Sequence, residues 1–215
     1  MRGLTTRSAA GGLIALFLLA TMAAEGARPP AGAAPQHPPS PGSIAGRLLV
    51  ATPDLEDPNF YQTIVYMVRH DRTGAMGLVI NRRLGRGPIA KLLQSLGLET
   101  DVDGGAEIDV HYGGPVQSDR GFMLHSPDFM GEDTVVLSQS VALTSSLDVL
   151  SAVAAGKGPQ HSLFALGYAG WAPDQLEHEL AAGAWVVVDS DETLLFDQQI
   201  ETKWQRALDR QGVDL

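Results

Sequence analysis

The sequence predicts an α+β fold with a mixed β-sheet, in a single domain. Short segments rich in Val, Ile, Leu and Tyr come first along the folded part of the chain. Segments with a helical spacing of apolar residues are inserted among them at irregular intervals. This order favours α+β over a regular winding of alternating strands and helices. No stretch repeats another, so one compact domain is the simplest organisation.

The first elements are expected to be three strands and a helix. Residues 47–51 and 62–69 are rich in β-branched, aliphatic and aromatic residues, which indicates strands. Residues 75–81 follow a turn at 71–74 and predict the return strand of a hairpin. Gly87-Pro88 is expected to open a helix, because proline suits the first helical position. Its apolar face would comprise Ile89, Leu92, Leu93 and Leu96.

The rest of the folded part predicts short strands and three helices. After an acidic loop over 99–107, strands are expected over 108–112, 121–125, 134–138, 162–166, 184–188 and 193–196. Residues 167–171 contain two glycines and predict a tight turn. Helices are expected after Thr144 or Ser145, from Pro173, and where Ile200, Trp204 and Leu208 recur every four residues.

The N-terminal region has the composition of a targeting segment followed by a linker. Within residues 1–26, Arg2 and Arg7 precede a short uncharged apolar run and then small residues, which is typical of a secretory signal peptide; a short anchor is the alternative. Residues 27–42 are rich in Pro and Ala and predict an extended linker. We therefore expect a periplasmic or exported protein whose domain spans 43–215. A misassigned start would instead leave that domain in the cytoplasm.

Composition excludes several classes of function. The chain has 215 residues, 44% of them hydrophobic and 19% charged, which suffices for a buried core. Its 15 Lys and Arg residues against 25 Asp and Glu give a net charge of −10. Such a charge argues against coating nucleic acid, and membrane contact is expected only through the N-terminal segment. Because the chain has no cysteine, disulfides, thiolate nucleophiles and cysteine-ligated metals are excluded.

Six short motifs follow one another along the folded part. They are Pro53-x3-Asp57-Pro58-x-Phe60, Gly74-Ala75-Met76-Gly77-Leu78-Val79-Ile80-Asn81, Gly113-Gly114-Pro115-Val116, Arg120-Gly121-Phe122-Met123-Leu124-His125, Gly167-Tyr168-Ala169-Gly170-Trp171 and Gln175-Leu176-Glu177. In this order they resemble the YqgE/AlgH family of bacterial proteins, from about residue 46 to the C-terminus. The resemblance implies an α+β domain whose mixed sheet curls into a pseudo-barrel with flanking helices. It implies no catalytic mechanism, although some members are described as transcriptional regulators.

A glycine-rich groove is the first candidate binding site. The two glycine-rich segments allow the backbone to turn sharply or to approach a neighbour closely, and nearby aromatic and polar side chains would complete a groove. The groove would comprise Gly113, Gly114, Pro115, His125, Tyr168, Gly170, Trp171, Gln175 and Glu177. In the alternative interpretation, the glycines serve backbone geometry and the aromatic residues fill the core.

A basic cluster is the second candidate site. Asn81, Arg82, Arg83 and Arg86 lie within six residues and could contact a phosphate or an acidic partner. The alternative is a solvated hairpin exit, because residues 43–215 carry 12 basic against 24 acidic residues.

Catalytic, metal-binding and cofactor signatures are missing from the sequence. The six histidines form no pair at metal-ligand spacing, and neither a phosphate-binding loop nor a nucleophile elbow occurs. We therefore predict no catalytic residue, metal or cofactor. A non-enzymatic binding or regulatory protein acting on another protein or a small ligand fits best. The alternatives are a transcriptional regulator, if the chain is cytoplasmic, and a hydrolase using His125 or His70 with a carboxylate.

Overall fold

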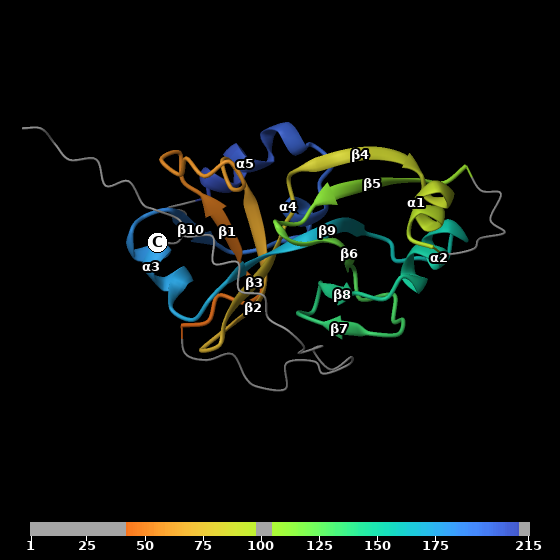
Figure 1. Ribbon diagram of the computed structural model, residues 1–215, viewed down its shortest axis with the longest axis horizontal. Helices are drawn as coiled ribbons and strands as arrows, with labels where there is room; N and C mark the ends of the chain where they lie inside the picture. The colour runs from red at the N-terminus through yellow and green to blue at the C-terminus, as the bar shows by residue number, and fades with distance from the viewer. Residues whose placement is uncertain (1–41, 98–104, 211–215) are drawn as a thin grey trace, which may run out of the picture. The chain divides into compact units, whose positions relative to one another are not determined.

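The computed structural model describes residues 42–97 and 105–210 (Figure 1). The predicted signal peptide and all but the last residue of the predicted linker lie outside these ranges. Within them, ten strands form one mixed sheet with the path β10-β1-β2-β3-β9-β6-β8-β7, and β4 and β5 join it through β9. Paired strands are antiparallel except β5 and β9, which are parallel. The predicted α+β class with a curled mixed sheet is confirmed.

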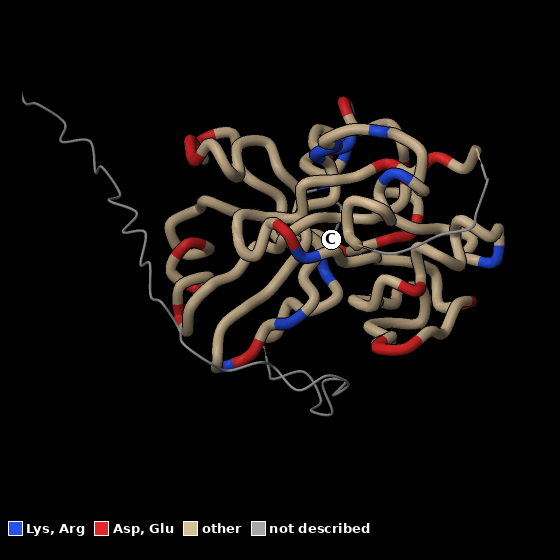
Figure 2. The backbone as a smooth tube through the Cα atoms, turned by 45° about the vertical axis from the view of Figure 1, so that its right-hand side comes forward, with Lys and Arg blue, Asp and Glu red and all other residues tan. Residues whose placement is uncertain are grey.

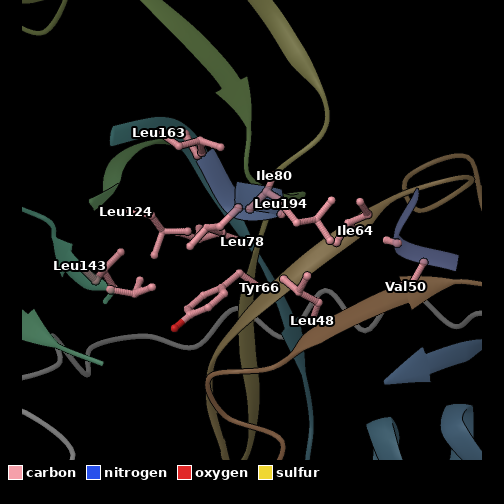
Figure 3. Packing of buried hydrophobic residues seen from close by; sticks show 14 of the residues in the cluster. Leu48, Val50, Ile64, Tyr66, Leu78, Ile80, Leu124, Leu143, Leu163 and Leu194 are labelled. Atoms are coloured by element: carbon pink, nitrogen blue, oxygen red, sulfur yellow. The ribbon is translucent and has the colours of Figure 1, made fainter. Parts of the chain in front are cut away.

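One part of the sheet consists of four antiparallel neighbours. These are β10 (Trp185–Val188), β1 (Leu48–Ala51), β2 (Ile64–Asp71) and β3 (Gly74–Val79). β1 is apolar throughout, and its residues alternate between two cores, because successive side chains of a strand point to opposite faces. Leu48 and Val50 enter the first core, whereas Leu49 and Ala51 enter the second. Figure 3 shows side chains of β1, β2 and β3 converging in the first core.

The other part of the sheet is built around one long strand, β9 (Ser162–Trp171). Its first half pairs with β5 (Glu107–Tyr112) and β6 (Val116–His125), and its last three residues pair with β3. The remaining strands are β4 (Arg83–Pro88), β7 (Thr134–Val136) and β8 (Ala142–Thr144). β9 therefore joins the two parts of the sheet (Figure 1).

The tight turn predicted over 167–171 is wrong, because these residues continue β9. Gly167, with φ +72°, crosses the chain at Gly113 and Gly114 instead of reversing direction. A Cβ on Gly114 would lie 2.1 Å from the Tyr168 carbonyl carbon, and one on Gly167 would lie 2.4 Å from the Gly114 oxygen. These glycines are thus needed for close approach of two chain segments.

Five helices occur in the described ranges. They are α1 (Ile89–Ser95), α2 (Asp148–Ala154), α3 (Gln175–Ala181), α4 (Glu192–Phe196) and α5 (Ile200–Leu208). α1 and α2 pack together in a third core with Met123 and Phe164. The strand predicted over 193–196 is wrong: Asp191 caps α4 by accepting a hydrogen bond from the Leu194 N–H at 2.7 Å.

No helix in the described ranges combines the length and the apolar character that crossing a bilayer requires. Acidic and basic positions are scattered along the tube rather than separated onto two sides (Figure 2).

Candidate functional site

A cavity of about 600 Å³ lies where four segments meet. The loop before β2, the segment that leads from β3 into the start of β4, the end of β5 and the first turn of α5 contribute the lining. It consists of Asn59, Asn81, Arg82, Arg83, Leu84, Tyr112, Ile200 and Glu201. Three of the four residues of the predicted basic cluster are among them. The fourth, Arg86, does not line the cavity and pairs with Glu107 at 2.8 Å.

Asn81 positions the cavity wall from beneath. Its side chain is buried, and its Oδ1 accepts a hydrogen bond from the Ile64 N–H at 2.8 Å. Its Nδ2 donates to the Gln62 carbonyl, also at 2.8 Å. These bonds attach the chain leaving β3 to the start of β2, because the amide replaces backbone partners at the end of the ladder. Arg82, the next residue, is thereby fixed in the wall.

Arg82 holds the opposite loop. Its Nη1 donates to the carbonyls of Pro58 and Asn59 at 3.1 and 2.9 Å, and its Nη2 donates to the Tyr61 carbonyl at 2.8 Å. The guanidinium carbon lies 6.0 Å from the centre of the Tyr112 ring, a cation–π distance. A guanidinium has five N–H donors, so these three bonds leave two for a ligand. Its charge has no carboxylate within ion-pair distance among the described residues.

Arg83 is exposed and only loosely paired. Its Nη1 lies 3.6 Å from Asp109 Oδ1, which is within ion-pair range but too far for a hydrogen bond. Asp109 Oδ1 is buried and has no hydrogen-bond partner in the described part of the chain. Glu201 adds one negative charge at the start of α5. The lining therefore combines two guanidinium groups with one carboxylate.

The remaining lining is aromatic or aliphatic. Tyr112 presents its ring, and its hydroxyl lies 3.4 Å from Asn59 Oδ1. Ile200 is half-buried, while the side chain of Leu84 is 61% exposed. Tyr61, whose carbonyl Arg82 binds, is 50% exposed. A ligand at this cavity would thus meet cationic and apolar groups together.

A buried lysine lies behind the cavity wall. Lys203 is fully buried on α5, and its Nζ donates to the carbonyls of Leu195 and Ile80 at 3.2 and 3.4 Å. Burial lowers the pKa of Lys203 to about 8. Burial also lowers the pKa of His111, whose Nδ1 lies 3.3 Å from the Phe164 carbonyl, and the nearby Lys203 charge lowers it further.

Sequence reasoning missed part of this site. Asn59 and Tyr112 lie in segments singled out for other reasons, and Glu201 lies next to a residue assigned to an apolar helix face. Lys203 follows Ile200 by three residues, a spacing that puts both on one side of a helix. That spacing places Lys203 beside the apolar face but does not indicate that its ammonium group is buried.

The structure does not gather the predicted glycine-rich groove in one place. Gly113 and Gly114 lie at the crossing with β9, and Tyr168 packs edge-on against Phe122 at 6.0 Å between ring centres. Pro115 is exposed beside the crossing. Trp171, Gln175 and Glu177 lie farther along, around α3. The site assignment of these residues stays a prediction.

Around α3, the carboxylate of Glu179 accepts hydrogen bonds from three side chains, those of Trp171, Trp185 and Gln175. Glu179 Oε2 accepts hydrogen bonds from the indole N–H groups of Trp171 and Trp185 at 2.9 and 2.8 Å. Its Oε1 accepts from Gln175 Nε2 at 2.9 Å. Gly170, one residue before Trp171, is exposed in β9. These contacts fix α3 against the sheet.

Both histidines considered for a hydrolase have their ring nitrogens engaged. His70 Nδ1 accepts from the Ile44 N–H at 3.2 Å, so Nε2 carries the proton that it donates to Glu177 at 2.8 Å. His125 is fully buried; its Nδ1 donates to the Ser126 carbonyl and its Nε2 accepts from Thr144 Oγ1, each at 2.8 Å. Burial lowers the pKa of His125. Neither imidazole is placed to take a proton from a substrate.

Comparison with known proteins identifies relatives along most of the chain. The AlgH-like family model matches residues 48–215. The chain belongs to the AlgH-like family. A UPF0301 protein of Caulobacter vibrioides is 45% identical over 172 residues, which are 79% of this chain and 88% of that protein. A UPF0301 protein of Methylococcus capsulatus is 39% identical over 181 residues, which are 84% of this chain and 98% of that protein.

Two solved structures share the fold of this AlgH-like chain. The solution structure of the AlgH protein from Pseudomonas aeruginosa is 43% identical and superposes with a TM-score of 0.68, covering 83% of this chain and 94% of that one. A protein from Corynebacterium diphtheriae is 17% identical and has a TM-score of 0.61, over 79% of this chain and 88% of that one. At that identity, the second likeness concerns the fold alone.

Proposed function

We propose that this AlgH-like protein is a non-enzymatic binding protein that holds an anionic group of its ligand against Arg82 and Arg83. The observation that carries the proposal is the set of contacts that Arg82 makes. Its guanidinium lines the cavity and is held by three hydrogen bonds to loop carbonyls. Two of its N–H groups remain without a partner, and no carboxylate in the described ranges pairs with it. A carboxylate or phosphate is the group that a guanidinium fork binds best.

The rigidity of the arginine supports binding. Three hydrogen bonds to the loop over 58–61 already fix the side chain, so a ligand would not have to order it. Ordering a long side chain costs on the order of 0.5–1.5 kcal/mol on binding, and a site that is ordered beforehand avoids that cost. Arg83, which has a looser partner, can then turn toward the same anion.

The composition of the lining supports a small anionic group with an apolar neighbour. Tyr112, Ile200 and Leu84 supply apolar surface, whereas Glu201 limits the positive charge of the site. The cavity lining contains no serine, histidine or lysine, and its candidate nucleophiles or bases are limited to Glu201 and Tyr112. These features favour binding over catalysis as the role of this cavity.

Titration of the full chain with benzoate, followed by ¹H–¹⁵N correlation spectra, tests this function. Benzoate should shift the amide signals of residues 81–84 and Tyr112, whereas uncharged benzamide should not. Arg83→Met should weaken the benzoate response by about tenfold, the value of one charge-assisted contact. Arg72→Met, in the exposed turn between β2 and β3, is the matched control. Equal responses to benzoate and benzamide would show that the cavity does not select an anion.

A further inference from the structure

Two of the four large apolar residues that are exposed in the described ranges belong to the cavity lining or to the loop that borders it. Four large apolar side chains are exposed in the described part of the chain, namely Tyr61, Leu84, Met130 and Val136. Leu84 lines the cavity, and Tyr61 belongs to the loop that Arg82 holds. We call Tyr61, Leu84 and Ile200 the apolar rim. Exposed apolar residues that gather beside a cavity are typical of protein-binding surfaces.

The charges around the rim select a ligand with a single negative group. Arg82 binds the backbone carbonyl of Tyr61, and Arg83 directly precedes Leu84. A carboxylate at the two guanidinium groups would therefore lie beside an apolar contact. Residues 43–215 carry 24 acidic residues, and Glu201 itself lines the cavity. A polyanion such as nucleic acid would be repelled by the net negative charge of the domain. One carboxylate avoids that repulsion and complements the two arginines.

The free edge of β4, beside the cavity, is better suited to side-chain contacts with a ligand than to pairing with a strand of a partner protein. β4 pairs with β5 alone in the described ranges, so its other edge is open. However, that edge carries Arg83, Arg86 and Pro88, and a register shift interrupts its pairing between Arg83 and Gly85. Charged residues, proline and bulges are the features that protect an edge from pairing with another strand. A bound segment is therefore expected to be short.

We infer that the cavity docks a short segment of a partner protein in which an aspartate or glutamate stands next to a large apolar residue. The carboxylate binds Arg82 and Arg83, and the neighbouring apolar side chain packs on Leu84 and Tyr61. This inference rests on the proposed function, because it requires the cavity to hold an anion. It adds that the anion belongs to a polypeptide and that the apolar rim contributes affinity.

An array of acetylated pentapeptides with the pattern Ser-X-Glu-Z-Ser tests the inference with the full chain as probe. Positions X and Z each take every amino acid, and a parallel array carries glutamine in place of glutamate. Strong binding is expected only where X or Z is large and apolar and the central residue is glutamate. Binding that does not depend on X and Z, or that survives the change to glutamine, would overturn the inference.

A pair of variants separates this inference from the proposed function. Tyr61→Ser should weaken binding of the strongest peptide about fivefold to tenfold, the effect of losing one partly exposed aromatic contact, and should leave the benzoate response unchanged, because Tyr61 does not line the cavity. Val136→Ser, at an equally exposed apolar residue of β7, should change neither. If benzoate binds while Tyr61→Ser leaves peptide affinity intact, docking at the rim is wrong and the anion site stands. If benzoate and the peptides all fail to bind, both proposals are wrong.

Discussion

Arg82 shows how much of the site depends on contacts that a single residue makes across the fold. Its sequence context, a run of polar residues after a strand, suits an exposed hairpin exit as well as a binding site. In the structure its guanidinium bonds to three carbonyls of a loop more than twenty residues earlier in the chain. No local pattern encodes that pairing, so sequence reasoning could identify the residue without deciding its role.

Lys203 has a measurable consequence at the same scale. Its pKa is lowered from 10.5 to about 8 by burial, so between these values the unfolded chain binds a proton that the folded chain does not. The free energy of unfolding must then rise with pH across this window, and this contribution is fully present above about pH 10.5. Below about pH 8 the folded state bears the full cost of a buried charge.

We predict that the stability of the wild-type protein relative to Lys203→Met increases by about 3 kcal/mol from pH 8 to pH 10.5. Urea unfolding of both proteins at several pH values measures this difference, and other titrating groups cancel because both proteins contain them. Lys157→Met, at an exposed lysine after α2, should show no such trend relative to the wild type. A flat difference for Lys203→Met would mean that the ammonium group is hydrated in the folded state.

At the scale of elements, the crossing of β9 over residues 113–114 is the most demanding packing in the sheet. Gly114 has φ +151° and lies so close to β9 that a Cβ would be 2.1 Å from the Tyr168 carbonyl carbon. Backbone atoms cannot move aside as a flexible side chain can. The crossing therefore has room only for glycine.

Gly114→Ala should accordingly destabilise the fold by more than about 3 kcal/mol or prevent folding, as expected when a substitution combines backbone strain with overpacking. Gly85→Ala in β4 is the matched comparison, because nothing lies within 4 Å of its Cβ position. Thermal unfolding followed by circular dichroism should show at most a small change for Gly85→Ala. A similar loss of stability in both variants would mean that any glycine replacement destabilises the fold, and that the crossing is not special.

Elements with a clear apolar period were predictable from the sequence, and those defined by their partners were not. The spacing of Ile200, Trp204 and Leu208 correctly predicted α5, and the branched residues of 62–69 correctly predicted most of β2. The strand β4 was missed because its glycines and arginines have low strand preference, and only pairing with β5 makes it extended. The Thr-Leu-Leu-Phe segment at 193–196 suits a strand, yet the cap at Asp191 makes it a helix.

The cavity illustrates the same limit. Asn81, Arg82 and Arg83 were predicted as a cluster because they are neighbours in sequence, and they do line the cavity. Ile200 and Glu201 reach it from more than a hundred residues away, through the packing of α5 against the sheet. Such a meeting depends on tertiary structure, which one sequence does not specify by pattern alone.

At the scale of the whole molecule, the N-terminal segment leads to a prediction about location. If residues 1–26 direct export and are removed, the form recovered from the periplasm should begin near residue 24 or 27. Intact mass spectrometry of the protein from fractionated native cells measures both location and start. A cytosolic form that retains residue 1, or that begins downstream of the apolar run, would contradict export and would reopen a role in gene regulation.

The position of β9 along the chain also determines when the sheet can be completed. β3, β5 and β6 all pair with β9, yet its residues are synthesised only from position 162 onward in a chain of 215. A nascent chain that has already produced β1 to β8 must therefore keep several strand edges without their central partner. Until β9 is synthesised, these unpaired strand edges are open to mispairing.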